Sequence, residues 1–365
     1  MDHHATPAPP VLRKRYVGPY ALGESEIFWS EHYTYLARQG YQLRDRYRPD
    51  WSPSWLGTET NPEDCEDSVI ALKMNSMDAT RQDGLCVRIK HVERGKNERK
   101  VVSYLKDTVE SENYVPLVEF LQDPLLPDKD FMISLYLRPF YNPGLTNASH
   151  MVDFVMQTLQ CLAFLHGKQV AHRNCCADNI MMDASSMYPM GHHPVRLECA
   201  RDGVSEAVLT NCIRRPVRYY FVDFSRASRF REGELRPYAR VREDLDKCLP
   251  EYKMAINGRL DTFKADVYRL GKLYQTTFLG AQYLRAGWPL ASLQTLVTAM
   301  MHPQPEMRPT ASRAIEIVQY VFREVNTTPY MVMWTTPQPP AIASPVGMWY
   351  TPLNASWPTT SSPSW

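Results

Sequence analysis

The fold is decided by the stretch Val170-Ala-His-Arg-Asn-Cys-Cys-Ala-Asp-Asn-Ile-Met-Met-Asp183. His172 and Arg173 precede an asparagine, Asn174, and a second asparagine follows five residues later at Asn179. An amide side chain donates and accepts hydrogen bonds, but it has no proton-accepting pKa near neutrality. Asn174 can therefore orient a hydroxyl group without acting as a general base, so the stretch predicts a fold more readily than an activity.

The part of the chain before this stretch alternates between β-like and helical patterns. A helical pattern from Glu24 to Arg48 is interrupted at Gly40, and another covers residues 96–109. Asp83-Gly84 is a typical hairpin turn between polar residues. The expected strands are Val69–Lys73, Leu85–Lys90, Tyr114–Phe120 and Phe131–Leu137.

The part after residue 138 is mostly helical in pattern. Ile180–Met182 and Tyr219–Val222 read as strands, and residues 184–216 form an insertion between them. Helices are predicted at His150–His166, Phe263–Phe278, Ser292–Met301 and Ala311–Val325. Residues 1–20 and the Pro-, Ser- and Thr-rich tail 327–365 have no helical or strand periodicity and are expected to be disordered.

Several motifs in a fixed order resemble a protein kinase-like domain. Besides His172-Arg173-Asn174, they are Trp51-Ser-Pro-Ser-Trp55, Asp78-Ala-Thr-Arg81, Phe164-Leu-His166 and Tyr220-Phe-Val-Asp-Phe224. The set is similar to the divergent kinase-like proteins of basidiomycete fungi and spans roughly residues 20–325. The resemblance implies an α+β, two-lobed fold, in which a small antiparallel sheet lobe with one main helix joins a larger, mainly helical lobe. The implied divisions are an N-terminal extension 21–66, a first lobe 67–138 and a second lobe 139–326.

The same resemblance assigns a nucleotide site. Lys90 ends a Val-Arg-Ile-Lys strand similar to the strand whose lysine contacts the phosphates of ATP, and Glu98 stands where its partner carboxylate belongs. Asp223 and Asn179 match the two ligands of Mg²⁺, while Asn174 and Arg173 occupy the catalytic loop. ATP and Mg²⁺ are thus the expected cofactors.

Three further residues resemble internal supports of that fold. Glu251 in Leu249-Pro-Glu251 and Arg308 are expected to form an ion pair, and Asp266 is expected to brace the backbone of the catalytic loop. For Arg173 we expect an acidic partner such as Glu243 or Asp244, which would fix the conformation of this segment.

Departures from the kinase pattern weigh against full activity. No Gly-Xaa-Gly-Xaa-Xaa-Gly precedes Lys90, Asn174 replaces the usual aspartate, and Cys176 replaces a lysine. The favoured interpretation is a pseudokinase that acts as a regulatory or scaffolding module and keeps residues for ATP and Mg²⁺. The alternative is a weakly active ATP-dependent protein serine/threonine kinase. A third possibility is a phosphotransferase for small-molecule hydroxyls, which a pocket lined by the 184–216 insertion would favour.

Composition limits the other functional classes. The chain has 365 residues, 44% of them hydrophobic, and a formal net charge of +1, which does not favour nucleic acid as a partner. No apolar run is long enough to span a bilayer, and the eight cysteines have no CxxC spacing. We therefore expect an intracellular protein, cytoplasmic or nuclear, with a nucleotide and other proteins as partners.

Overall fold

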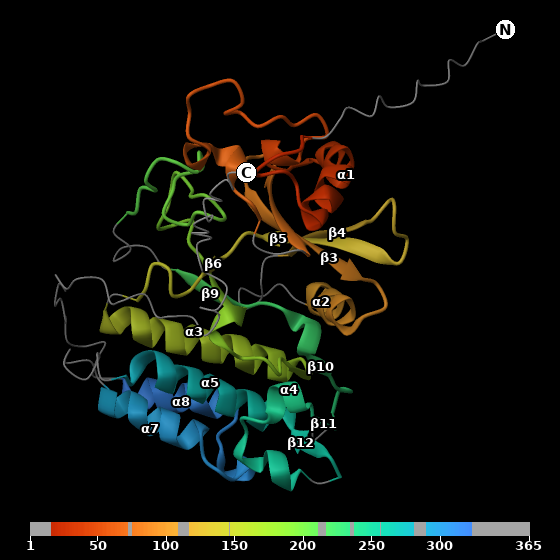
Figure 1. The fold of residues 1–365 in the computed structure, drawn as a ribbon. Helices are drawn as coiled ribbons and strands as arrows, with labels where there is room; N and C mark the ends of the chain where they lie inside the picture. Colours follow the sequence, from red (N-terminus) through yellow and green to blue (C-terminus); the bar gives the residue numbers. More distant parts are fainter. Residues whose placement is uncertain are drawn as a thin grey trace, which may run out of the picture. The chain divides into compact units, whose positions relative to one another are not determined.

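The computed structural model describes residues 16–71, 75–108, 117–145, 147–210, 217–233, 237–255, 257–280 and 290–322. It is a mixed α/β structure with a curled antiparallel sheet and several helices (Figure 1). The tail expected to be disordered, 327–365, and residues 1–15 lie outside the described residues. No helix in the described part is both long and apolar enough to cross a membrane.

The main sheet has five antiparallel strands in the order β1-β2-β3-β5-β4. Their bounds are β1 Tyr41–Gln42, β2 Ser76–Arg81, β3 Cys86–Glu93, β5 Lys129–Leu135 and β4 Leu117–Gln122. The turn at Asp83-Gly84 joins β2 to β3 as predicted, with Thr80 opposite Cys86 and Gly84 at φ +84°. This short hairpin fixes which residues precede it as a strand.

Two predictions in this region are wrong. The apolar run Val69–Lys73 is not a strand where it is described, because the hairpin register pairs β3 with the more polar Ser76–Arg81 instead. The helix that begins at Glu24 ends at Arg38, before Gly40 as expected, but residues 41–48 continue as β1 and a 3-10 turn rather than as a second helix.

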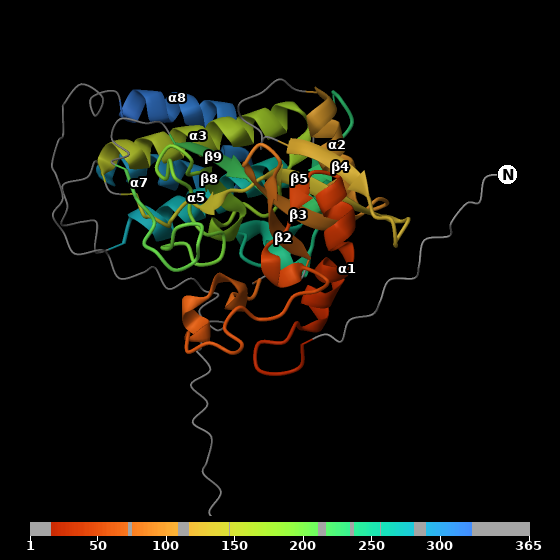
Figure 2. The same cartoon turned by 90° about the horizontal axis from the view of Figure 1, so that it is seen from above.

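Helix α1 (Glu24–Arg38) covers one face of the sheet, and Figure 2 shows it alongside β2 and β3. Trp29 and Leu36 of α1 are buried with the strand residues Val87, Ile89 and Phe131. Helix α2 (Asn97–Thr108) follows β3 and packs against the 3-10 turn Phe224–Arg226. The sheet therefore has an apolar face under α1 and a second face toward α2 and that turn.

The second half of the described chain consists mainly of helices that share a large apolar core. Figures 1 and 2 show them side by side: α3 Ala148–Gly167, α5 Thr262–Phe278, α7 Leu290–Met300 and α8 Ala311–Val321. All four were predicted: the end of α5 and the start of α8 coincide with the prediction, and the other ends differ from it by one to four residues.

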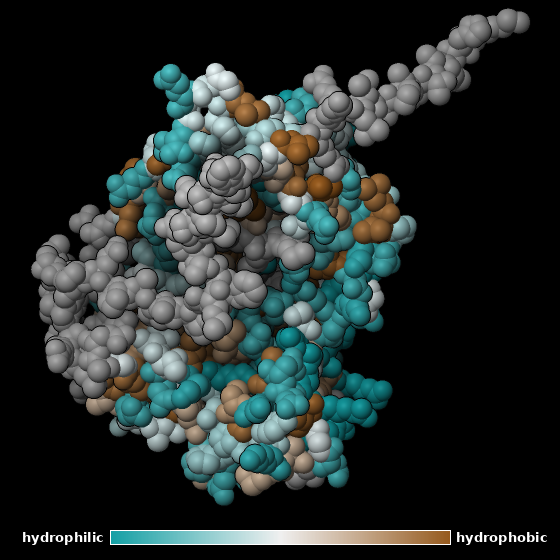
Figure 3. Space-filling model, in the orientation of Figure 1, coloured by the Kyte–Doolittle hydropathy of each residue, from teal (hydrophilic) through white to brown (hydrophobic). Residues whose placement is uncertain are grey.

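Short strands and one short helix lie next to these helices. One small sheet contains β6 Arg138–Pro139, β8 Ile180–Asp183 and β9 Arg218–Phe221. Two-stranded pairs join β7 Val170–Ala171 to β10 Ser228–Arg229, and β11 Tyr238–Arg240 to β12 Arg259–Asp261, while α4 is the single turn Glu243–Asp246. These strands carry the loops that hold the candidate site. On the face drawn in Figure 3, the coloured surface is mostly hydrophilic and its hydrophobic residues are scattered.

Candidate active site

The site begins with Lys90 on β3. Its ammonium group lies 2.6 Å from Glu98 Oε1 on α2 and 3.1 Å from Asp223 Oδ1. Side chains alternate between the faces of a strand, so Lys90 projects away from the apolar face that buries Val87 and Ile89. Burial favours the neutral acid and raises the pKa of Glu98, although Lys90 opposes this effect. One cation thus joins two carboxylates that are distant in the sequence.

Asp223 follows β9 directly and has a left-handed backbone with φ +63°. Such a conformation costs about 1–3 kcal/mol in a non-glycine residue and tends to occur at functional sites. Burial alone would raise the pKa of Asp223, but the charge and hydrogen bond of Lys90 prevail and lower it. The neighbouring Val222 N–H donates to the Asn179 carbonyl at 2.9 Å, so the two expected metal ligands lie on adjacent strand ends.

The loop from His172 to Asn174 is held from below by Asp266 of α5. The carboxylate of Asp266 accepts hydrogen bonds from the backbone N–H of His172 at 2.8 Å and of Arg173 at 2.7 Å. Asp266 is fully buried, and although burial opposes ionisation, hydrogen bonding to His166 lowers its pKa. The expectation that Asp266 braces this loop is confirmed.

Asn174 stands at the outer end of the braced loop, where it is only partly buried. The backbone carbonyl oxygen of Asn174 accepts a hydrogen bond from Asn179 Nδ2 at 3.0 Å. The loop is therefore ordered around an amide at the position where a carboxylate would serve as a base.

Arg173 binds a different acid from the two that we expected. Its guanidinium lies 3.0 Å from Asp246 Oδ2, and Asp246 also pairs with Arg269 of α5. Asp246, the last residue of the single-turn helix α4, points inward and is fully buried, whereas Asp244 points outward to Arg226. The expectation of an acidic partner in this segment is confirmed, but the partner is Asp246 and neither of the two acids named. Nothing in the sequence indicated that Arg269 takes part.

A second support lies farther from the loop. Arg308 donates two hydrogen bonds to Glu251, at 2.8 and 2.6 Å, and both residues are buried. The expected ion pair is confirmed. Its bidentate geometry fixes the segment after β11 to the start of α8.

Sequence reasoning missed the polar row next to Lys90. Arg88 faces the same side of β3, opposite Asp78 on β2 and Ser134 on β5. The Arg88 guanidinium donates to Ser76 Oγ at 3.2 Å, and burial lowers its pKa despite the nearby Asp223 and Glu98. Strand alternation with Lys90 could have placed Arg88 in the site.

The link between β1 and β2 explains the missing glycine motif. It runs through residues 43–75 rather than through a tight hairpin. This link includes Trp51, whose indole N–H donates a hydrogen bond to the Asp67 carboxylate at 2.9 Å. No short loop of backbone N–H groups covers Lys90 in the described part of this link.

The insertion packs against this link and against the end of β5. Tyr136 donates to the Pro194 carbonyl at 2.5 Å, and His193 lies 3.2 Å from Glu66. Between them lies a pocket of about 420 Å³ that is lined by the insertion and by the site-facing side of the β2–β3 hairpin. Its lining includes Asp78 and Cys86.

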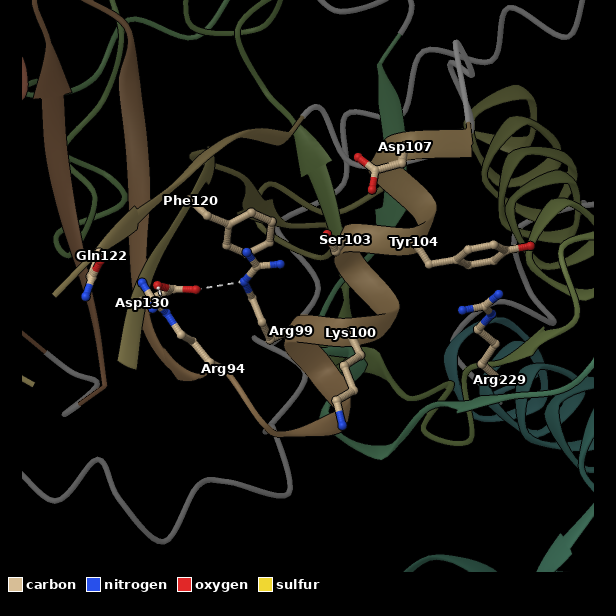
Figure 4. A pocket seen from close by; sticks show the side chains of 10 residues that line it. All are labelled: Arg94, Arg99, Lys100, Ser103, Tyr104, Asp107, Phe120, Gln122, Asp130 and Arg229. Carbon is tan, nitrogen blue, oxygen red and sulfur yellow. Dashed lines mark hydrogen bonds and ion pairs between the residues drawn. The ribbon is translucent and has the colours of Figure 1, made fainter. Parts of the chain in front are cut away.

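A larger hollow of about 890 Å³ lies elsewhere, between α2 and β4 (Figure 4). Its lining includes the basic residues Arg94, Arg99, Lys100 and Arg229, and Asp130 pairs with both Arg94 and Arg99. None of the residues predicted for the catalytic or nucleotide site lines it. We therefore place the candidate active site at Lys90 and Asp223 rather than in this groove.

The residues fit one end of a magnesium nucleotide. The cations Lys90 and Arg88 suit phosphate oxygens, and the oxygens of Asp223 and Asn179 suit Mg²⁺. The sheet surface beside them is polar at Asp78, Arg88 and Ser134, which suits a flat aromatic base poorly, since ligand pockets are mostly apolar.

Comparisons with known proteins give little further guidance. No family model matches the chain, and no curated protein does either. Among 1796 matching chains of solved structures is a crystal structure of the Rad53 kinase domain and SCD2. It is similar with a TM-score of 0.41 and 14% identity, over 67% of this chain and 83% of that one. The function has to be inferred from the side chains of the site.

Proposed function

We propose that this chain is a divergent protein kinase-like domain of two lobes that acts as a regulatory or scaffolding module, with phosphoryl transfer impaired or lost. The lobes would be the sheet with α1 and α2, and the helices with the catalytic loop. Support comes from separate parts of the chain: the Lys90–Glu98 pair, the Asp266 brace and the Glu251–Arg308 pair. ATP and Mg²⁺ are proposed ligands at Lys90, Glu98, Asp223 and Asn179.

Asn174 carries the proposal of impaired transfer. The loop around it is held by Asp266 and by the hydrogen bond from Asn179 to the backbone carbonyl of Asn174, so Asn174 belongs to a formed loop. General-base catalysis is typically worth about 10²–10⁴-fold in rate. Positioning and metal electrostatics account for most of phosphoryl transfer, so losing the base weakens an enzyme severely.

The test is a phosphoryl-transfer assay with labelled ATP and Mg²⁺ on protein acceptors, comparing the wild type with Asp223→Ala. We expect the wild-type rate to exceed that of the variant by less than about 100-fold, because no base assists the acceptor hydroxyl. A wild-type rate about 100-fold above the variant would overturn the proposal. Folding of both proteins is checked by circular dichroism, since Asp223 lies outside the apolar core.

A second candidate is a slow phosphotransferase, favoured by the fully formed ion pair of Lys90 and Glu98. Under this candidate, Asn174→Asp raises the transfer rate by about 10²–10⁴-fold. Under the first candidate, the substitution leaves the rate at background, because the glycine motif and the lysine that Cys176 replaces are still absent. The 420 Å³ pocket beside the insertion extends the second candidate to small hydroxyl-bearing acceptors, which the same assay compares with proteins.

A further inference from the structure

The row of side chains beside Lys90 is mostly polar. The cross-strand partners on this face are Ser76 with Lys90 and Asp78 with Arg88, and β5 adds Ser134 next to Arg88 and the apolar Met132 next to Lys90. Residues two apart on a strand lie about 7 Å from each other, within reach of one extended ligand. Arg88 and Lys90 can therefore act on the same molecule.

Arg88 is directed toward the Lys90 end of this row. Its guanidinium bonds to Ser76, which lies opposite Lys90, and the carboxylates that act on it are Asp223 and Glu98. Asp78 is engaged elsewhere, 3.1 Å from Arg44 Nε. Arg88 is thus influenced by Asp223 and Glu98, the same two carboxylates that pair with Lys90.

We propose that Arg88 is a second phosphate-binding residue, and that the cleft recognises the metal-bound phosphate chain of its ligand rather than a base. The inference rests on the proposed nucleotide site. It assigns to one side chain the role that backbone N–H groups play in glycine-rich phosphate loops, since the β1–β2 link forms no such loop in its described part.

The chemistry of Arg88 suits this role. A guanidinium carries five donors in a planar fork that matches phosphate oxygens in pairs. A guanidinium can also stack on an aromatic ring, but the donors of Arg88 are directed to Ser76, at the Lys90 end of the row where the phosphate chain would lie. A phosphate chain with Mg²⁺ neutralises both cations and uses Asp223 as a metal ligand.

The experiment is a thermal-shift titration of the full chain at constant free Mg²⁺ with three probes: inorganic tripolyphosphate, ATP and adenosine. A ligand that binds the folded state stabilises it by RT ln(1 + L/Kd), where L is the free ligand concentration, so the dependence of the melting temperature on ligand concentration reports the Kd. We expect tripolyphosphate and ATP to bind with affinities within about 3-fold of each other and adenosine to give no shift. ATP binding more than about 10-fold tighter than tripolyphosphate, or a shift with adenosine, would refute the inference.

Variants separate the cleft from other basic surfaces. Arg88→Gln keeps a donor for Ser76 and is expected to weaken both phosphate ligands by about 10–100-fold, the effect of one charge-assisted hydrogen bond. Lys100→Gln, in the exposed basic groove beside α2, is the matched control and is expected to change neither.

Tripolyphosphate binding that is lost in Lys100→Gln but kept in Arg88→Gln would move the site to the groove and refute the inference. Absence of any shift would refute it too, yet would leave the scaffolding proposal intact. Conversely, robust phosphoryl transfer by the wild type would overturn the scaffolding proposal without touching the role of Arg88.

Discussion

The two faces of the five-stranded sheet are built from the same strands and have opposite chemistry. On the face under α1, β3 and β5 place Val87, Ile89, Phe131 and Ile133, all fully buried. Lys90 projects from the other face, because side chains alternate along β3, and it forms ion pairs with two carboxylates. A period of two residues thus separates the side chains that hold the sheet to α1 from those that form the site.

The comparison shows where stability and function reside in this sheet. Burying an apolar side chain contributes about 1.5–3 kcal/mol, whereas the attraction within the buried Lys90–Glu98 pair is largely offset by the cost of burying two charges. Truncations on the α1 face should therefore strongly destabilise the protein. Conservative changes on the Lys90 face that leave no unpaired charge should leave it folded and alter what it binds.

The largest expected effect is that of Phe131→Ala. Phe131 is fully buried on the α1 face and contacts the rings of Trp29, Tyr35 and His91. Truncation removes this packing and leaves a cavity, so we expect a loss of about 3–5 kcal/mol in the free energy of unfolding. Urea denaturation followed by fluorescence measures it. Ser134→Ala, on the opposite face of the same strand, is the control and should cost less than about 0.5 kcal/mol.

A cost of less than 1 kcal/mol for Phe131→Ala would show that α1 does not depend on this face. An equal cost for both substitutions would remove the distinction between the faces.

The next effect is that of Asp123→Ala, which removes a buried carboxylate at the edge of the α1 face. Asp123 accepts from His32 of α1 at 3.1 Å and from His91 of β3 at 2.8 Å, and it also caps the backbone N–H of Leu125 and Leu126. Without it, these donors lose their acceptor, so we expect a loss of about 2–4 kcal/mol. Urea denaturation measures this loss.

Asp128→Ala is the comparison variant, because Asp128 lies in the same β4–β5 turn, outside the buried set. A similar small cost for both variants would contradict a special role of Asp123 in attaching α1.

The sequence predicted this sheet in part, and the reasons for success and failure are physical. Asp83-Gly84 located the hairpin because a short turn requires a residue that tolerates positive φ, and Gly84 has φ +84°. The strand before it is Ser76–Arg81 and not the more apolar Val69–Lys73, because the register that the turn imposes decides which residues pair with β3. A short hairpin connection such as residues 82–85 limits its partner strand more strictly than hydrophobicity does.

The site was predicted unevenly for a similar reason. The resemblance to kinase-like motifs brought Lys90, Glu98 and Asp223 forward as candidates, and in the structure the Lys90 ammonium lies within 3.1 Å of both acids. The partner of Arg173 was not predictable among neighbouring acids. Only the packing of α4 against Arg269 selects Asp246 over Asp244.

The smallest effect concerns His192, which belongs to the insertion that packs beside the polar side of the hairpin. Its ring lies against Tyr136 and Tyr188, and Nδ1 lies 3.1 Å from the His193 carbonyl. Burial, with Arg138 and Arg201 nearby, lowers the pKa of His192 to about 4. The unfolded chain has an ordinary histidine pKa of about 6.5 and so binds the proton first as the pH falls.

The stabilising contribution of neutral His192 is therefore complete above pH ~6.5 and is lost as the pH falls toward about 4. Allowing for the partial solvent contact of the ring, we expect wild-type protein to lose about 1–2 kcal/mol more stability than His192→Gln between pH 7 and pH ~4.5. Urea denaturation of both proteins at the two pH values measures this difference. Parallel pH profiles for the two proteins would mean that His192 is not shielded from solvent, and therefore that the insertion does not pack closely against the hairpin.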